Sequence, residues 1–212
     1  MSFDTKETDR LLSTTRSVRR RLDLDRPVDP KVVLECLRLA VQAPTASNGQ
    51  GWRWLIVTDG EKRAELARLY AEGGADYLKS AAAREMDPQT RRVYESAIHL
   101  ADVLGRVPVH VIACLQGRAD NLPNILSASM YGSIIPAAWS FMLALRSRGL
   151  GSAWTTLHLM KEKEAAALLG IPDDVTQVAL LPVAYTVGDE FKPAERPPVE
   201  TITYWDTWGD TR

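Results

Sequence analysis

Two arginines and a serine near the start of the chain have side chains suited to binding an oxyanion. The stretch "TRSVRRRLD", residues 15–23, contains Arg16, Ser17 and Arg19. Guanidinium groups and a hydroxyl match the geometry of phosphate oxygens. The same arginines could instead form a solvated helix face, ion pairs with nearby carboxylates, or a contact with nucleic acid. The stretch alone therefore leaves the ligand open.

A second candidate site is the stretch "APTASNGQGW", residues 43–52, between a predicted helix and a predicted strand. Pro44, Thr45, Ala46 and Asn48 bring small and polar groups to this loop, and its glycines allow a ligand close to the backbone. The loop could equally be a plain connection. Ligand binding by this loop would require further contacts from other segments of the chain.

Arg196 lies in the stretch "ERPPVE", where two prolines follow it and stiffen the chain. This makes it a third candidate for holding an anion. The stretch "GLGSAW", residues 149–154, resembles a dinucleotide fingerprint, but it follows a predicted helix and the GxGxxG pattern is incomplete. A Rossmann domain is therefore not predicted.

Composition narrows the possible partners and the compartment. The 212 residues carry a formal net charge of -1, with a pI near 6.3, which argues against a broad nucleic-acid or anionic-membrane surface. Cys36 and Cys114 lie in apolar segments and read as buried, reduced thiols. The three histidines lack metal-site spacing, so no metal is predicted. The polar N-terminus has no apolar signal core, and a cytoplasmic location is expected.

The uncharged stretch 121–145 is long enough to span a bilayer. Its serines, asparagines and Pro136 favour a buried central helix instead, and no membrane contact is predicted. We expect this helix over about 122–148, with Pro136 either kinking it or marking its start and Gly149 closing it.

The remaining pattern mixes helices and strands. Helices are predicted over 4–15, 30–43, 59–73, 93–105 and 160–170, and strands or extended turns over 52–58, 107–115, 150–159 and 175–188. Gly73 is expected to end the third helix, and 74–92 to form a mobile excursion or lid. The tail 188–212 is expected to wrap a partner subunit. The predicted fold is α+β, an α/β/α three-layer sandwich with a mixed sheet, in one domain over 1–212.

Five stretches in order make the chain similar to a known family. "TRSVRRRLD", "APTASNGQGW", "RSRGLGSAW", "LLGIPDDVTQVALLPVAY" and "ERPP" together resemble the motifs of the flavin-dependent nitroreductase family over roughly residues 12–200. The chain departs from the family pattern at Thr15, Arg21 and Gly51, and Thr155 and Thr156 replace a glycine pair.

This resemblance implies a homodimer that binds one FMN in each of two clefts at the subunit interface. Arg16, Ser17 and Arg196 would contact the phosphate, and Arg19 would act as the catalytic cation at the flavin N1 and O2 edge. The remaining implied contacts are Pro44, Thr45, Ala46 and Asn48 from the partner subunit, Ser129, Met130 and Ser133 along the interface, and Trp154, Thr155, Thr156 and Leu157 near N5. Arg20 and Arg21 are expected to be solvated or ion-paired.

The implied activity is ping-pong transfer of hydride from NAD(P)H to a nitroaromatic, a quinone or a similar small acceptor. Two alternatives stay open. One is a same-fold reductase or dehydrogenase for another acceptor, such as a dehalogenating or deazaflavin-linked enzyme. The other is a protein that stores the flavin without turnover.

Overall fold

The computed structural model describes residues 3–82 and 84–211, which form two compact units. The larger unit is Ser17–Asp189 and contains the whole β-sheet. The smaller unit joins the residues up to Arg16 with those from Glu190 onward. It contains helix α1 (Thr5–Thr14) and the short 3-10 turn η4 (Val199–Ile202). The domain predicted over 1–212 therefore has its layered core in the larger unit.

The sheet has four strands in the order β1-β2-β4-β3. The strands are β1 (Trp52–Val57), β2 (Val109–Gln116), β3 (Leu150–Ser152) and β4 (Val175–Tyr185). All three ladders between these strands are antiparallel. The prediction of an α+β fold is confirmed, whereas the prediction of a mixed sheet is wrong for the strands that the structure describes.

The antiparallel arrangement of β1 and β2 follows from the helix pair that connects them. Helix α3 (Gly60–Ala82) leaves β1, and α4 (Pro88–Val103) returns toward β2. The Tyr77 and Tyr94 hydroxyls lie 3.3 Å apart, which places the late part of α3 beside the early part of α4. Because the chain returns to the end of the sheet that it left, β2 runs opposite to β1.

The prediction that Gly73 ends a helix is wrong, since α3 continues to Ala82. The predicted excursion 74–92 accordingly contains the last turns of α3 and the first turn of α4. Asp87 caps α4, accepting hydrogen bonds from the backbone N–H groups of Gln89 and Thr90. Mobility of 74–92 remains a prediction.

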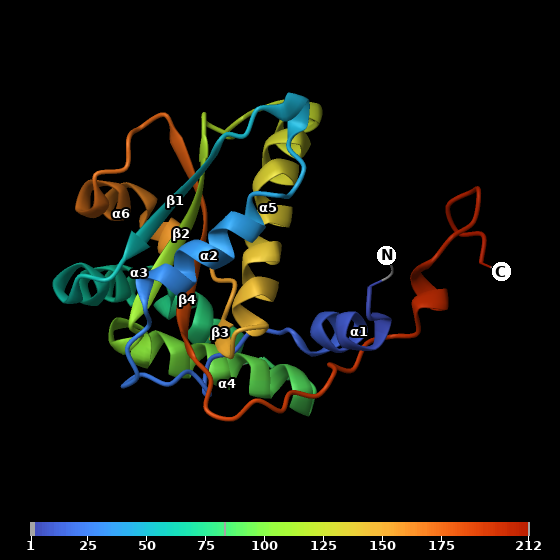
Figure 1. The fold of residues 1–212 in the computed structure, drawn as a ribbon, viewed down its shortest axis with the longest axis horizontal. Helices are drawn as coiled ribbons and strands as arrows, with labels where there is room; N and C mark the ends of the chain where they lie inside the picture. Colours follow the sequence, from blue (N-terminus) through green and yellow to red (C-terminus); the bar gives the residue numbers. More distant parts are fainter. Residues whose placement is uncertain (1–2, 83, 212) are drawn as a thin grey trace. The chain divides into compact units, whose positions relative to one another are not determined.

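Helices cover both faces of the sheet, in three layers (Figure 1). On one face, α2 (Pro30–Ala40) and α5 (Asn124–Arg146) pack against alternate residues of β2, and on the other lie α3 and α6 (Glu162–Leu169). The β2 residues facing α2 and α5 are Val109, Val111, Ala113 and Leu115. Three 3-10 turns complete the larger unit: η1 (Ala46–Asn48), η2 (Leu104–Arg106) and η3 (Leu157–Lys161).

Helix α5 is the central helix that the uncharged stretch predicts. It begins at Asn124, so Pro136 lies inside it and does not mark its start, and Gly149 follows in the left-handed region at φ 74°. Its length and mean hydropathy of 1.3 would suit a membrane span. Eight of its side chains are nevertheless buried within the larger unit, as expected for a core helix.

Candidate functional site

The segment Ser17–Arg19 runs beside strand β3. The Val18 backbone N–H donates to the Ser152 carbonyl over 2.8 Å, and the Val18 side chain is buried. In extended chain, neighbouring side chains point to opposite sides. Ser17 is accordingly exposed, while Arg19 is partly buried. Pairing of Val18 with β3 therefore fixes the backbone position of Ser17 and Arg19.

Arg19 makes a specific contact with helix α4. Its Nη1 donates to Ser96 Oγ over 3.3 Å, and Ser96 Oγ in turn donates to the Val93 carbonyl over 2.7 Å. Burial lowers the pKa of Arg19, and the neighbouring Tyr70 partly offsets this effect. The guanidinium is thus a partly desolvated cation held between segments, and such a cation interacts more strongly with developing negative charge than one in open water.

Of the four predicted contacts between Trp154 and Leu157, Thr156 has the most accessible donors. Thr155 is buried, and both its backbone N–H and its hydroxyl donate to the Leu180 carbonyl, over 3.1 and 3.0 Å. Thr156 is exposed, and within residues 3–82 and 84–211 neither its N–H nor its hydroxyl donates a hydrogen bond. Trp154 packs partly against the core. Donors at this edge therefore come from Thr156.

The loop 43–51 has a strained backbone. Ser47, Asn48 and Gln50 all have positive φ, at 51°, 54° and 47°. Left-handed conformations cost non-glycine residues roughly 1–3 kcal/mol each, and such strain concentrates at functional sites. The Gln50 N–H donates to Thr45 Oγ1, and the Gln50 side chain donates to Asn48 Oδ1, which holds the loop in this conformation.

The same loop is attached to the N-terminal half of α5. The Ala46 N–H donates to Ser133 Oγ over 3.0 Å, and Ser133 Oγ donates to the Ser129 carbonyl over 2.8 Å. The Trp52 indole N–H donates to the Ser133 carbonyl over 2.8 Å. The loop and the predicted interface residues of α5 thus form one connected set.

The structure divides the predicted site within the larger unit into two sets. The first contains Ser17 and Arg19 beside β3, and the second contains loop 43–51 with the start of α5. Ser152 of β3 pairs with Val183 of β4, whereas Trp52 lies across β2 at the level of Thr176. At about 3.3 Å per residue, the seven residue steps along β4 from Thr176 to Val183 span about 23 Å. Figure 1 likewise shows η1 and β3 at opposite ends of α5.

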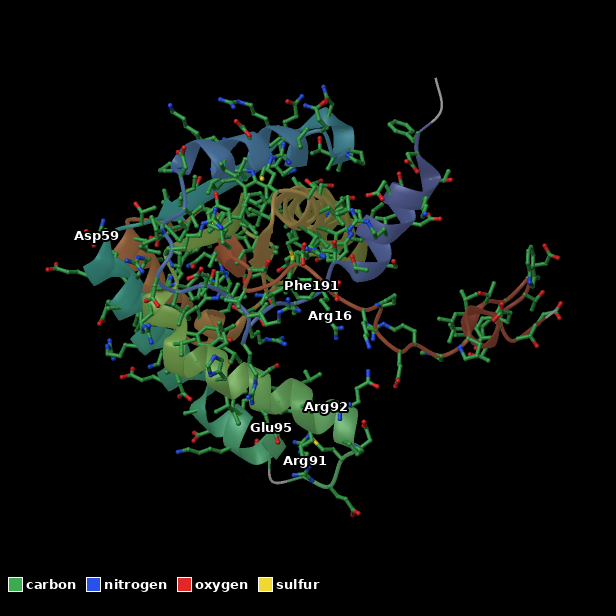
Figure 2. The ribbon with its side chains drawn as sticks, turned by 60° about the horizontal axis from the view of Figure 1, so that its bottom comes forward. Arg16, Asp59, Arg91, Arg92, Glu95 and Phe191 are labelled. Carbon is green, nitrogen blue, oxygen red and sulfur yellow. The ribbon has the colours of Figure 1, made fainter. Side chains whose placement is uncertain are left out.

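Two predicted phosphate contacts belong to the smaller unit. Arg16 Nη1 donates to the Lys192 carbonyl over 3.0 Å. Figure 2 shows Arg16 near Phe191, which comes directly before Lys192 in the sequence. Arg196 is exposed, and its Nη1 donates to the carbonyl of Glu195. Arg16 therefore connects the first helix to the tail.

The other two arginines of the cluster make contacts with carboxylate or carbonyl oxygens, and their expected solvated or ion-paired roles remain predictions. Arg20 is exposed and lies 3.9 Å from Glu95, which Figure 2 shows on α4. Arg21 Nε donates to the Val187 carbonyl over 2.7 Å.

Burial also agrees with the predictions for the thiols. Cys36 and Cys114 are both buried and free, and burial raises the pKa of the Cys114 thiol to about 12. Within the described part of the chain, no group of three His, Cys, Asp or Glu side chains could hold a metal ion.

Two residues that contact the site were missed in the sequence. Ser96 holds Arg19, and Tyr70 makes a side-chain hydrogen bond with Thr155. Both lie on helices whose sequences show only an ordinary amphipathic pattern. The adjacent Gly73 and Gly74 were the available signal, since a glycine pair inside a helix indicates a close packing partner.

Comparisons with known proteins place the chain in a family. The Nitroreductase family pattern matches residues 12–185, so the chain belongs to the nitroreductase family. The 5,6-dimethylbenzimidazole synthase of Rhodospirillum rubrum is 27% identical over 164 residues, which are 75% of this chain and 73% of that protein.

Two solved structures share the fold. Iodotyrosine deiodinase bound to FMN and 3-iodo-L-tyrosine is 22% identical and superposes with a TM-score of 0.70, covering 94% of this chain and 98% of that one. The FMN and NADPH-dependent nitroreductase NfnB from a Sphigopyxis strain is 18% identical, with a TM-score of 0.67, covering 94% and 99% of the two chains. Both show that the nitroreductase-like fold is the fold of this chain.

Proposed function

We propose that this chain is a cytoplasmic, homodimeric, FMN-dependent oxidoreductase. It would take hydride from NAD(P)H and transfer it to a nitroaromatic, a quinone or a similar small acceptor. Family membership supports the class of chemistry. The observation that carries the proposal is the partly buried guanidinium of Arg19, which donates a hydrogen bond to Ser96 and leaves a desolvated cation available to a bound flavin.

The residues present fit a flavin mononucleotide. Guanidinium groups such as those of Arg16 and Arg196, and a hydroxyl such as that of Ser17, are each of a kind that binds phosphate, and the strained polar loop 43–51 exposes groups for a ribityl chain. A bound flavin supplies the two-electron chemistry itself, so the chain needs only to bind it, orient it and stabilise charge. Arg19 would place a cation at the N1 and O2 edge, where negative charge accumulates on reduction. Thr156 would present its donors near N5.

The separation of the two sets supports a dimeric site. About 23 Å separates the β3 end from the loop end along β4, so we infer that the loop set comes from a second subunit. Helix α5 offers a surface for this contact, because Tyr131, Ile135 and Trp139 recur at helical spacing and are 37–43% exposed. The tail 188–212 would wrap the same partner.

A test of the proposal begins with the colour of the purified protein. Protein reconstituted with FMN should retain the spectrum of an oxidised flavin after gel filtration. NADH or NADPH should bleach it under anaerobic conditions, and a nitroaromatic or a quinone should restore the spectrum. Protein that cannot retain FMN would contradict the proposal, and retention without bleaching by either donor would favour flavin storage.

A second candidate function keeps the flavin and changes the acceptor. The similarity to a 5,6-dimethylbenzimidazole synthase and the fold shared with a deiodinase favour it. Protein that bleaches with a nicotinamide donor, but regains its colour only with a halogenated or other acceptor, would support this candidate.

A further inference from the structure

Helix α3 approaches the segment 155–161 at the distance of backbone contact. A Cβ atom at Gly74 would lie 2.6 Å from Leu157 Cδ1, and one at Gly73 would lie 2.9 Å from the Leu157 carbonyl oxygen and from Met160 Cβ. Such atoms do not normally approach within 3.0 Å. At Gly73 the clash is with the backbone, so this position requires glycine in the observed packing, whereas a methyl at Gly74 would require the Leu157 side chain to move.

Gly73 and Gly74 lower the intrinsic helical stability of α3. Each glycine inside a helix is less favourable than alanine by about 1 kcal/mol, and Gly73 and Gly74 lie in the middle of α3. The close approach to Leu157 supplies a physical reason for glycine at both positions. α3 is thus adapted to this one contact.

Tyr70 extends the contact by one helical turn. It lies four residues before Gly74 and therefore on the same face of α3. Its side chain is 2% exposed and hydrogen-bonds the side chain of Thr155, and its hydroxyl also interacts electrostatically with Arg19. Tyr70 hydrogen-bonds the Thr155 side chain, and the Leu157 side chain packs against the backbone of Gly74. The residue between them, Thr156, is the exposed one.

We propose that Tyr70, Gly73 and Gly74 form a positioning clamp that fixes Thr156 at the edge of the cofactor. The proposal rests on the proposed function, because the clamp matters for chemistry only if a flavin binds there. Its members act through Thr155, Leu157 and Arg19. Since the Tyr70 hydroxyl hydrogen-bonds Thr155 and interacts electrostatically with Arg19, the clamp also couples the Thr155–Leu157 segment to the cation.

The first test measures the clamp in the protein without flavin. In Gly74→Ala, hydrogen–deuterium exchange of the amides in 155–161 should be at least tenfold faster than in wild type, because the new methyl displaces Leu157. The control is Gly105→Ala in η2. Its new Cβ would meet Ala64 and Ala67 of α3 at an ordinary 3.5 Å. It should leave exchange in 155–161 unchanged. Equal exchange in Gly74→Ala and wild type would overturn the clamp.

A second-site variant separates a specific clash from general damage. The methyl of Gly74→Ala collides with the Leu157 side chain, so Gly74→Ala/Leu157→Ala should exchange like Leu157→Ala alone. The methyl of Gly73→Ala meets the Leu157 carbonyl, which no side-chain change removes. Gly73→Ala/Leu157→Ala should therefore remain fast. Rescue of both glycine variants, or of neither, would contradict the geometry.

The third test measures the effect on the cofactor with Tyr70→Phe, which keeps the ring and removes the hydroxyl. Retention of FMN should change less than threefold. The kcat for reduction by NAD(P)H should fall about tenfold with little change in KM. The preference for reduced flavin should also weaken about tenfold, which corresponds to a two-electron potential about 30 mV more negative.

A stability control accompanies this variant, and the outcomes separate the two proposals. Val33→Ala shortens a buried side chain on the core-facing side of α2. It should lower the Tm while leaving the flavin potential unchanged. Wild-type protein that binds no FMN would contradict the proposed function and leave the exchange results to decide the clamp. Wild-type protein that binds and reduces FMN, with Tyr70→Phe equal to it in potential and kcat, would overturn the clamp alone.

Discussion

Arg19 donates a hydrogen bond from Nη1 to Ser96 Oγ over 3.3 Å, joining segments that are 77 residues apart in the sequence. Ser96 is itself fixed, since its hydroxyl donates to the Val93 carbonyl within α4. A guanidinium held by one hydrogen bond and partly desolvated has fewer accessible positions than a free surface arginine. Helix α4 thus takes part in orienting the proposed catalytic cation.

Arg19→Ala should lower the rate of flavin reduction by about 100-fold, the scale seen when one charge-stabilising group is removed from an active site. Arg19→Lys should fall between this variant and wild type, because it keeps the charge and loses the fork geometry. Anaerobic stopped-flow bleaching with NADH and NADPH measures both.

Ser96→Ala provides the matched comparison, because it removes the hydroxyl that accepts from Arg19 and leaves the cation in place. Its reduction rate should fall less than that of Arg19→Ala, and Arg19→Ala/Ser96→Ala should equal Arg19→Ala alone. Additive losses in the double variant would mean that Ser96 acts independently of Arg19.

Phosphate binding is tested by two arginines of the same cluster. Arg16→Ala should weaken FMN binding at least tenfold, since a charge-assisted hydrogen bond to phosphate contributes about 1.5–3 kcal/mol. Arg20→Ala should change binding less than twofold, because Arg20 is exposed and lies 3.9 Å from an exposed carboxylate. Fluorescence titration of the apoprotein with FMN measures both, and equal losses would contradict the assignment.

The apolar face of α5 predicts the behaviour of an interface variant. Ile135→Glu adds a charge to a side chain that is 43% exposed, so the subunit itself should still fold. If this face is buried between subunits, the unpaired charge should cost several kcal/mol of association and convert dimer to monomer. Light scattering after gel filtration gives the mass, and the monomer should also lose FMN.

Lys31→Glu supplies the matched control, since it changes charge on the exposed surface of α2. Its mass and its FMN content should equal those of wild type. A monomeric wild-type protein with full FMN content would contradict the shared site.

Local signals in the sequence predicted most of the helices and strands. Asp29 before Pro30 marks the start of α2, and the structure shows Asp29 accepting from the Lys31 N–H over 2.8 Å. Gly170 ends α6 in the left-handed region. Both are short-range effects, in which a side chain or a backbone angle decides the boundary within a few residues.

Features that depend on distant segments could not be predicted. Gly73 reads locally as a helix end, yet α3 continues because the glycine pair faces Leu157, more than 80 residues away. The direction of β2 depends on how α3 and α4 pack, which no residue of β2 encodes. Burial of Thr155, with Thr156 exposed beside it, likewise depends on the bridge to Leu180.

Two buried histidines predict how stability depends on pH. His110 and His158 are fully buried, and desolvation lowers the pKa of each to about 4. His110 Nε2 donates a hydrogen bond to the Leu104 carbonyl over 2.9 Å, whereas both ring nitrogens of His158 lack a partner within the described residues. Both rings are therefore neutral in the folded protein at pH 7.

In the unfolded chain each histidine titrates near its ordinary pKa of about 6.5. At lower pH, protons therefore bind the unfolded state more readily than the folded state. The free energy of unfolding has its full value above pH 6.5 and decreases as the pH falls toward 4. Each histidine can remove about 3 kcal/mol at most across this window. Urea unfolding at pH 7.5, 6.0 and 5.0 should show a declining free energy of unfolding.

His158→Leu should flatten this decline by about 1.4 kcal/mol per pH unit between pH 6 and 5, because one proton fewer is taken up on unfolding. At pH 7.5 the variant should be about as stable as wild type, since the imidazole that it replaces is buried without a hydrogen-bond partner. Leu180→Val, a core variant without a titratable group, should lower stability equally at every pH. A decline in His158→Leu as steep as that of wild type would show that His158 is already charged, or hydrated, in the folded protein.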